Sequence, residues 1–256
     1  MSARYLIIVA AVAGLLVAVP SNPARAADPR ESGPLAIAIT YHVAPANRAA
    51  FRKAMEETEA PQFQRWKDEG VLQSARLLVN RHVDSVTWDA MALLTFARYS
   101  DVARWNRIER SSPAGLSPAA LALTSAIETA PGDLMREGGD PAHGPFLVIP
   151  YEVIVPVNEY LAYLDGYVVP QMDGWKEEGV LARYGVFLAR YPAGRPWQSM
   201  LILEYKDDAA LGARDVTTAK VRSRLANNPK WKAISDAKKN VRNERAPFIG
   251  DAIPAR

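Results

Sequence analysis

The hydrophobic and polar positions of this chain alternate first as a strand and then as a helix. Over residues 35–43 apolar side chains fall on every second position, which is the period of a half-buried β-strand. Over residues 47–69 they recur with helical spacing, and Gly70 stands where a glycine commonly ends a helix. Two further alternating segments, 71–80 and 86–96, predict a pair of strands. We therefore expect the first part of the chain to fold as β-α-β-β.

The same pattern returns 109 residues further along the chain. Pro61–Leu72 reads PQFQRWKDEGVL and Pro170–Leu181 reads PQMDGWKEEGVL, and the offset holds without a gap to Trp88 and Trp197. A fixed offset of this kind indicates two copies of one αβ unit. The duplication describes the architecture of the chain and does not by itself define an activity.

Prolines mark corresponding places in both copies. Pro61 and Pro170 fall within the predicted helices, and because proline has no N–H to donate, we expect each helix to be kinked there. The pairs Ser-Pro at 117–118 and Asn-Pro at 228–229 place a capping residue before a proline in the first helical turn. They predict one helix that continues to about residue 129 and another near the C-terminus.

These signals predict an α+β fold with two tandem ferredoxin-like units, each β-α-β-β-α with an extra helix. Such a unit has an antiparallel sheet with helices on one face only, so its other face must be buried or wet. Two units that press their open faces together form a pseudo-dimeric α/β barrel with a cavity between the sheets. The expected divisions are a signal peptide (1–26), a leader (27–34), repeat 1 (35–135), a Gly- and Pro-rich linker (136–144) and repeat 2 (145–252).

The order of elements and the pattern Trp-Lys-x-Glu-Gly-Val-Leu at 66–72 and 175–181 resemble the dimeric α/β-barrel superfamily. Its members include antibiotic-biosynthesis-monooxygenase-like, EthD-like and NIPSNAP-like proteins. The resemblance covers about residues 35–250 and implies a fused form, in which one chain supplies both units. Such a chain would be a monomeric pseudo-dimer or a homodimer. The shared pattern is a signature of the fold and not of one chemistry.

The N-terminal segment has the anatomy of a secretory signal peptide. An apolar run of 15 residues at 5–19 follows Arg4, and Ala24 and Ala26 offer small residues before a cut at Ala27. The run is shorter than the ~20 apolar residues of a spanning helix. We therefore expect a periplasmic or secreted protein without a stable membrane anchor. The chain has no cysteine, so its core must hold the fold without disulfides.

Composition excludes several familiar functions. Loss of residues 1–26 removes two arginines, so the formal net charge falls from +3 to +1. No basic stripe with interleaved aromatic residues is left, so we expect no nucleic-acid partner. Three scattered histidines and no cysteine argue against a dedicated metal site. A phosphate-binding loop, a dinucleotide fingerprint and a nucleophile elbow are absent, so no cofactor is predicted.

Alternation sorts the strand residues into two faces. The rows that begin at Trp88 and Trp197 are apolar, and we expect them to lie under the helices. The opposite rows should face the cavity between the sheets. They carry the charged or titratable candidates His42, Glu152, Arg76, Arg183, Asp89 and Glu204. A buried charge is costly unless it is paired, so these residues predict a ligand, water or mutual salt bridges.

The sequence thus predicts an exported protein that binds a small, partly apolar molecule between two sheets. His42 beside a carboxylate could act as a general base, and the arginines could hold a carboxylate or another anion. The chemistry to test first is a cofactor-independent oxygenase or isomerase-type proton transfer. Alternatively, the charges pair with one another, and the protein is a non-catalytic periplasmic structural or interaction protein. The sequence leaves open whether it is an enzyme.

Overall fold

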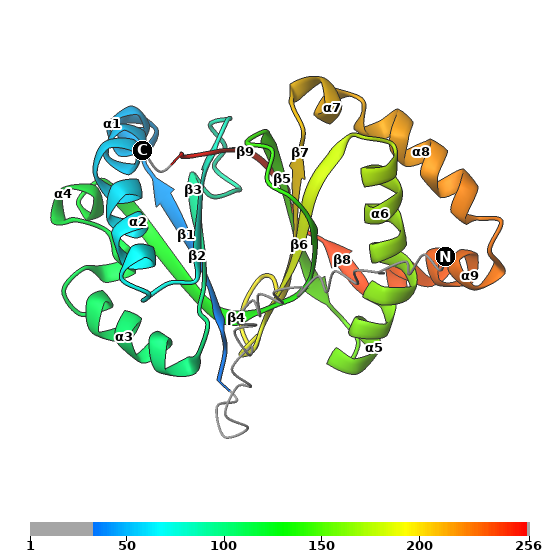
Figure 1. The fold of residues 1–256 in the computed structure, drawn as a ribbon, viewed down its shortest axis with the longest axis horizontal. Helices are drawn as coiled ribbons and strands as arrows, with labels where there is room; N and C mark the ends of the chain where they lie inside the picture. Colours follow the sequence, from blue (N-terminus) through cyan, green and yellow to red (C-terminus); the bar gives the residue numbers. More distant parts are fainter. Residues whose placement is uncertain (1–32, 255–256) are drawn as a thin grey trace, which may run out of the picture.

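The computed structural model describes residues 33–254 (Figure 1), so the predicted signal peptide lies outside the described residues. The strands are β1 (Ala36–Val43), β2 (Ser74–Asn80), β3 (Ala90–Thr95), β4 (Thr124–Gly139), β5 (Pro145–Val153), β6 (Leu181–Ala189), β7 (Ser199–Tyr205), β8 (Arg242–Glu244) and β9 (Phe248–Ala252). The α-helices are α1 (Arg48–Ala54), α2 (Ala60–Asp68), α3 (Tyr99–Glu109), α4 (Pro118–Leu121), α5 (Val157–Tyr163), α6 (Val169–Glu177), α7 (Asp208–Gly212), α8 (Arg214–Leu225) and α9 (Pro229–Ala237).

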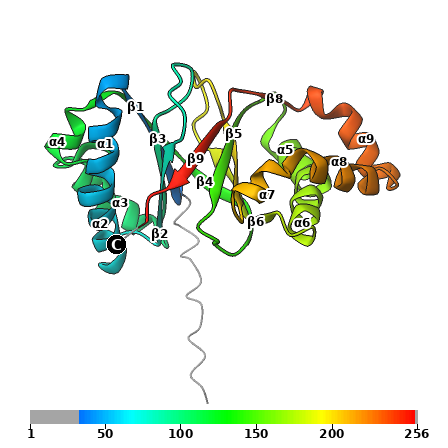
Figure 2. The same ribbon diagram turned by 90° about the horizontal axis from the view of Figure 1, so that it is seen from above.

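These strands form one antiparallel sheet that lies between two groups of helices. Helices α1–α4 flank it on one side and α5–α9 on the other, as both views show (Figures 1 and 2). The pairing order is β7-β6-β4-β1-β3-β2-β9-β5-β8, and β5 also pairs with β7, so the ladder returns to its first strand. The predicted α+β fold with a large antiparallel sheet is confirmed. We refer below to the first half, up to α4, and the second half, from β5.

Both halves widen their first helix at corresponding positions. Met55–Glu59 and Leu164–Val168 are π-helical, and each segment leads into an α-helix with proline in its first turn. These prolines, Pro61 and Pro170, cannot donate a hydrogen bond to the preceding turn. A single π-helical turn is a common way for a helix to absorb such an irregularity. The predicted helix irregularity is therefore present in both halves as a change of helical winding.

Strand β4 departs from the prediction made for this segment. Ser117 caps a helix as expected, but α4 ends at Leu121 and not near residue 129. The chain then runs extended as β4, which includes the first four residues of the predicted 136–144 linker. β4 pairs with β1 of the first half and β6 of the second, and β9 likewise pairs with β5 and β2. These hydrogen bonds between the halves override the local helix and turn preferences.

Buried apolar side chains form three clusters, one under each group of helices and one inside the ring of strands. The third cluster draws on both halves. Its members include Ala36, Ala38, Leu78, Met91, Leu93, Phe146, Val148, Phe187, Met200 and Ile202. The expectation of a cavity between the sheets is therefore wrong for the middle of this space, which side chains fill. Open space between the halves is left only toward the ends of the strands.

Trp88 and Trp197 belong to this third cluster and do not lie under the helices as expected. Their rings meet edge to face, with 5.9 Å between centroids and 75° between planes. β3 and β7 begin two residues later, at Ala90 and Ser199. The two-residue alternation of a strand therefore does not extend to the tryptophans. They pack against each other where the two halves meet.

Candidate functional site

The six predicted site residues separate into two groups at opposite ends of the strands. In the sheet Glu204 lies opposite both Arg183 and Phe146, near the start of β5. Glu152 comes six residues after Phe146 on the same strand, which is about 20 Å at ~3.3 Å per residue. His42 is likewise far along β1 from the end where the arginines lie. The structure does not bring His42 and Glu152 into one site with the arginines.

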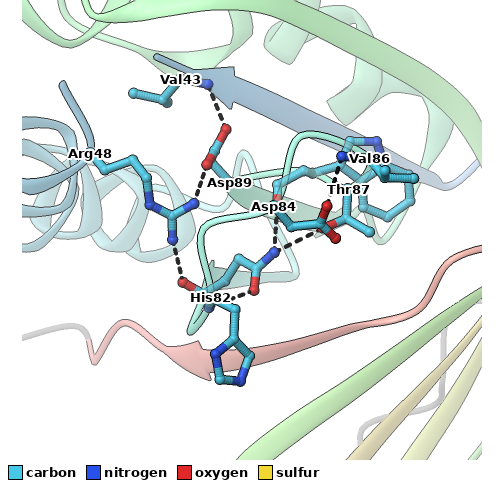
Figure 3. Close-up of polar contacts among 9 residues, drawn as sticks. Val43, Arg48, His82, Asp84, Val86, Thr87 and Asp89 are labelled. Atoms are coloured by element: carbon cyan, nitrogen blue, oxygen red, sulfur yellow. Dashed lines mark hydrogen bonds and ion pairs between the residues drawn. The ribbon is translucent and has the colours of Figure 1, made fainter. Parts of the chain in front are cut away.

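Asp89 belongs to a network of hydrogen bonds at the far end (Figure 3). Its carboxylate accepts a hydrogen bond from the backbone N–H of Val43 at 2.7 Å and pairs with Arg48 at the start of α1. Arg48 also donates to the backbone carbonyl of Asn80 at 2.9 Å, and the Asn80 side chain donates to Thr87 Oγ1 at 3.0 Å. Asp89 therefore ties strand ends to a helix, and its partners are on this chain and not on a ligand.

Glu152 and His42 lie apart from this network. Glu152 is at the surface, where it accepts hydrogen bonds from Arg245 at 2.6 Å and Asn243 at 3.3 Å. The side chain of His42 is half-buried and makes no hydrogen bond or ion pair with any residue between 33 and 254. The role of His42 as a base remains a prediction.

Arg76, Arg183 and Glu204 line a cleft of about 460 Å³ where the two halves meet, which we call the seam cleft. Glu204 is buried, and one of its oxygens accepts hydrogen bonds from the backbone N–H groups of Ala142 and His143, at 2.8 and 2.9 Å. Burial, together with the positive charge of Arg183, lowers the pKa of Arg76 to about 10. The structure thus brings together three of the six predicted residues.

A second pocket, of about 550 Å³, lies between the sheet and the helices of the second half. We call it the tyrosine–arginine pocket. Its lining residues are Ile149, Tyr151, Tyr163, Tyr167, Val168, Gln171, Met172, Trp175, Leu201, Arg214, Arg222, Lys238, Lys239, Arg242, Asn243 and Glu244. Five are lysine or arginine and one is a carboxylate, so the pocket is positively charged.

Five of these residues each have a buried polar atom that makes no hydrogen bond within the described part of the chain. The atoms are Tyr163 Oη, Tyr167 Oη, Trp175 Nε1, Arg214 Nε and Arg242 Nη1. All five carry a hydrogen and can donate it. Leaving one buried donor unpaired costs about 1–3 kcal/mol, and native proteins contain few such groups. Five around one pocket indicate an incomplete set of partners.

Arg242 is held by aromatic rings instead of a carboxylate. Its guanidinium carbon lies 3.6 Å from the ring centroid of Tyr151 and 5.1 Å from that of Tyr163. Burial raises the pKa of Tyr151 to about 12, although the positive charge of Arg242 opposes this shift. Burial also raises the pKa of Tyr163. At neutral pH both hydroxyls keep their protons, and the pocket presents cations and donors to a ligand.

Our sequence analysis did not single out this pocket, although the repeat contained a signal for it. Arg214 follows Trp105 by the repeat offset of 109 residues, as Trp175 follows Trp66. In the first half, Trp105 packs on Trp66 with 5.4 Å between ring centroids. In the second half, the guanidinium of Arg214 lies 5.8 Å from the centroid of Trp175. The replacement of a core tryptophan by arginine was visible in the sequence.

Metal and membrane sites were also sought among residues 33–254. That part of the chain contains no group of three or more His, Cys, Asp or Glu side chains that could hold a metal ion. It also contains no helix that is long and apolar enough to cross a membrane.

No protein-family model matches the chain, and no curated protein matches it in sequence. Its fold does match solved structures. A "putative monooxygenase" from Lactobacillus acidophilus NCFM aligns at TM-score 0.56 and 11% identity, over 87% of this chain and 95% of that one. An anthrone oxidase-like protein aligns at TM-score 0.55 and 10% identity, over 87% and 92% of the two chains.

These similarities concern the fold alone, because the identities are so low. The structural neighbours are antibiotic-biosynthesis-monooxygenase-like proteins of the dimeric α+β-barrel type. They support the resemblance to that superfamily on which the sequence analysis drew.

Proposed function

We propose that this protein binds a small, partly apolar anion in the tyrosine–arginine pocket. The observation that carries the proposal is the set of five unpaired buried donors among residues that surround one space. The pocket volume of about 550 Å³ falls within the ~300–1,000 Å³ of typical ligand sites. Small rotations of the tyrosine and arginine side chains would bring their donors to acceptor oxygens of the ligand.

The lining of the pocket defines the chemical class of ligand. Guanidinium groups such as those of Arg214 and Arg242 bind carboxylates or phenolates through strong, charge-assisted hydrogen bonds. The rings of Tyr151, Tyr163 and Trp175 offer flat apolar walls, against which an aromatic body can stack. An aromatic carboxylate combines both properties, and an uncharged amide of the same shape lacks the first.

A second candidate function is cofactor-independent oxygenation, or isomerase-type proton transfer, on such a ligand. The observation that favours it is the fold shared with a "putative monooxygenase" and an anthrone oxidase-like protein. When a proton leaves a carbon next to an aromatic carbonyl, negative charge develops on the oxygen. Donors such as Tyr163, Tyr167 and Arg242 are the groups that stabilise this charge. His42 belongs to the other half, so its predicted role as base would require a separate site.

We also propose that the chain is a tandem, single-chain form of the dimeric α/β barrel, with units at about 35–135 and 145–252. The 109-residue offset, the paired π-helical segments and the returning ladder of strands support this. A closer relationship to EthD-like or NIPSNAP-like proteins stays a prediction. Export rests on the sequence of residues 1–26, and N-terminal sequencing of protein recovered from the periplasm or medium would test it.

Ligand binding is tested most directly on protein purified from its own compartment. Native mass spectrometry would show whether a small molecule accompanies it, and calorimetric titration would compare aromatic carboxylates with their uncharged amides. We expect the carboxylates to bind more tightly, and Arg242→Met or Arg214→Met to weaken binding at least about 10-fold, which is ~1.4 kcal/mol. Lys232→Met, at an exposed residue of α9 paired with Asp236, is the matched control and should bind normally.

Two results would argue against this function. Equal affinity for carboxylates and amides would remove the role of the arginines. Unchanged binding in both arginine variants would place the ligand elsewhere. If no small molecule binds at all, the alternative of a non-catalytic interaction protein gains weight.

A further inference from the structure

The seam cleft contains two arginines that have no counter-ion on this chain. Arg76 lies on β2 of the first half and Arg183 on β6 of the second, and both line the cleft. Neither guanidinium forms a hydrogen bond or an ion pair with any residue in the described range 33–254. The contact that Arg76 does make is with the ring of Phe146, whose centroid lies 5.7 Å from its guanidinium carbon.

The two positive charges act on each other in a partly buried place. Burial first, and then the charge of Arg183, lowers the pKa of Arg76, and Glu204 and Glu137 oppose this only in part. Two like charges that share a site, without a partner between them, raise the free energy of the folded protein. Arg183 and Ser74 also line a neighbouring hollow of about 380 Å³, so the space continues past the arginines. This arrangement is unfavourable in the free protein and becomes favourable when an anion binds.

The nearest buried carboxylate is engaged by a loop and not by the arginines. Glu204 lies opposite Arg183 in the sheet, and one of its oxygens holds the backbone N–H groups of Ala142 and His143. His143 has a φ of +58°, a left-handed conformation that costs a non-glycine residue about 1 kcal/mol or more. Glu204 thus stabilises a strained turn that places His143 on the wall of the cleft.

From this arrangement we infer a second ligand site, independent of the tyrosine–arginine pocket, in which an oxyanion bridges Arg76 and Arg183 across the seam. Lys67 adds a third positive charge to the wall, and Phe146 and Ile253 add apolar surface. Carboxylate and phosphate oxygens share the geometry that a pair of guanidinium groups recognises. Because one arginine belongs to each half, the bound anion also ties the halves together.

Thermal unfolding of the full mature protein tests this site. Inorganic phosphate, and separately succinate, would be compared with chloride at matched ionic strength. We expect the Tm to rise with phosphate or succinate, since a ligand that binds only the folded state stabilises it. The anion that gives the larger rise distinguishes the two sources of oxyanion.

Variants connect the response to the two arginines. Arg76→Met and Arg183→Met should each raise the Tm in chloride, because the like-charge contact is gone, and should abolish the rise with phosphate or succinate. Arg136→Met removes an arginine of β4 that already pairs with Asp165, and it should keep the rise. Arg242→Met alters only the tyrosine–arginine pocket and should keep it too, so failure of the proposed function and failure of this site are distinguishable.

Three outcomes would overturn the inference. The first is a wild-type Tm that is the same in phosphate, succinate and chloride. The second is a rise that persists in both seam variants but disappears in Arg242→Met, since the anion then binds in the other pocket. The third is a lower Tm of both seam variants in chloride together with an unchanged anion response, because the arginines would then be structural.

Discussion

The helix-covered cores of the two halves are built on the same plan, but one is closed and the other is open. At three corresponding positions the first half packs aromatic rings with centroids 5.2–6.0 Å apart: Phe63, Trp66 and Trp105. At the same three positions the second half has Met172, Trp175 and Arg214, and these residues line the tyrosine–arginine pocket. Two substitutions in an otherwise retained framework accompany the change from a packed core to a pocket with free donors.

The difference teaches how one chain can divide stability and binding between two copies of a unit. Both halves contribute strands to one continuous ladder, so a well-packed first half can stabilise a second half whose core is incomplete. A pocket with unpaired buried donors lowers stability until a ligand binds. Variants that treat the two halves in parallel can test this division.

The largest effect is expected from removing the ring that closes the first core. Trp105 is fully buried, and Trp105→Ala should lower the free energy of unfolding by about 3–5 kcal/mol, because a large cavity remains. Arg214→Ala, the matched change in the second half, should cost less than about 1 kcal/mol, since Arg214 is partly exposed and its Nε is already unpaired. Urea unfolding of both variants measures the difference. Equal losses would mean that Arg214 is as much a core residue as Trp105.

A smaller effect is expected where the halves use different polar ties for the same purpose. Asp89 accepts from Val43 N and pairs with Arg48, whereas Gln198 accepts from Val153 N at 2.7 Å without such a pair. Asp89→Ala should cost about 2–4 kcal/mol, because Arg48 is left mostly buried without its charge partner. Gln198→Ala should cost only about 1–2 kcal/mol.

A double variant sharpens this comparison. Residue 158, which corresponds to Arg48 in the second half, is Asn158. Asp89→Gln combined with Arg48→Asn therefore gives the first half the second-half tie, and it should recover most of the loss seen in Asp89→Ala. The free energy of unfolding in urea is again the measurement. No recovery would show that the charge pair has a role beyond holding Val43.

Buried tyrosines of the second half should make stability fall at alkaline pH. Burial raises the pKa of Tyr151 and of Tyr205 to about 12. The unfolded chain loses these protons near pH 10, so each contribution is full below pH 10 and is lost as pH rises toward 12. The slope should approach ~1.4 kcal/mol per pH unit per tyrosine. Tyr205→Phe, which removes a hydroxyl without a hydrogen-bond partner, should make the slope shallower, and an unchanged slope would contradict the assignment.

The smallest effect is expected where the halves are alike. Gly70 and Gly179 end their helices with φ of +67° and +80°, a conformation that favours glycine. A Cβ would meet nothing within 4 Å at Gly70, and at Gly179 only the movable Lys206 Nζ at 3.4 Å. Each glycine-to-alanine change should therefore cost about 1 kcal/mol by backbone strain alone. Thermal unfolding checks whether the two losses agree, and a clear inequality would show that the helix ends are not equivalent.

Local patterns were sufficient to predict most elements of the fold, because their causes lie within a few residues. Alternation located β2 and β3, and the glycine at position 70 marked the end of the first helix. β4 could not be predicted in this way. It is extended because it pairs with β1 and β6, strands that lie far from it in sequence on both sides.

The candidate site shows the same limit. Parity along a strand predicted a common face for Arg76, Arg183 and Glu204, and all three line the seam cleft. The same parity placed His42 and Glu152 on that face, but they lie at the other end of their strands. Parity defines which face a side chain occupies, whereas strand register defines which end of that face it reaches.

By itself the sequence determined the duplicated plan: the order of strands and helices, the helix irregularity before Pro61 and Pro170, and the exchange of tryptophan for arginine at position 214. Each of these depends on neighbouring residues or on comparison of the two copies. Only the tertiary structure decided that the space between the sheets is filled and that the open pockets lie at the seam and under the second-half helices. Burial and hydrogen bonding there are shared by residues from many strands and helices, and no local pattern contains that information.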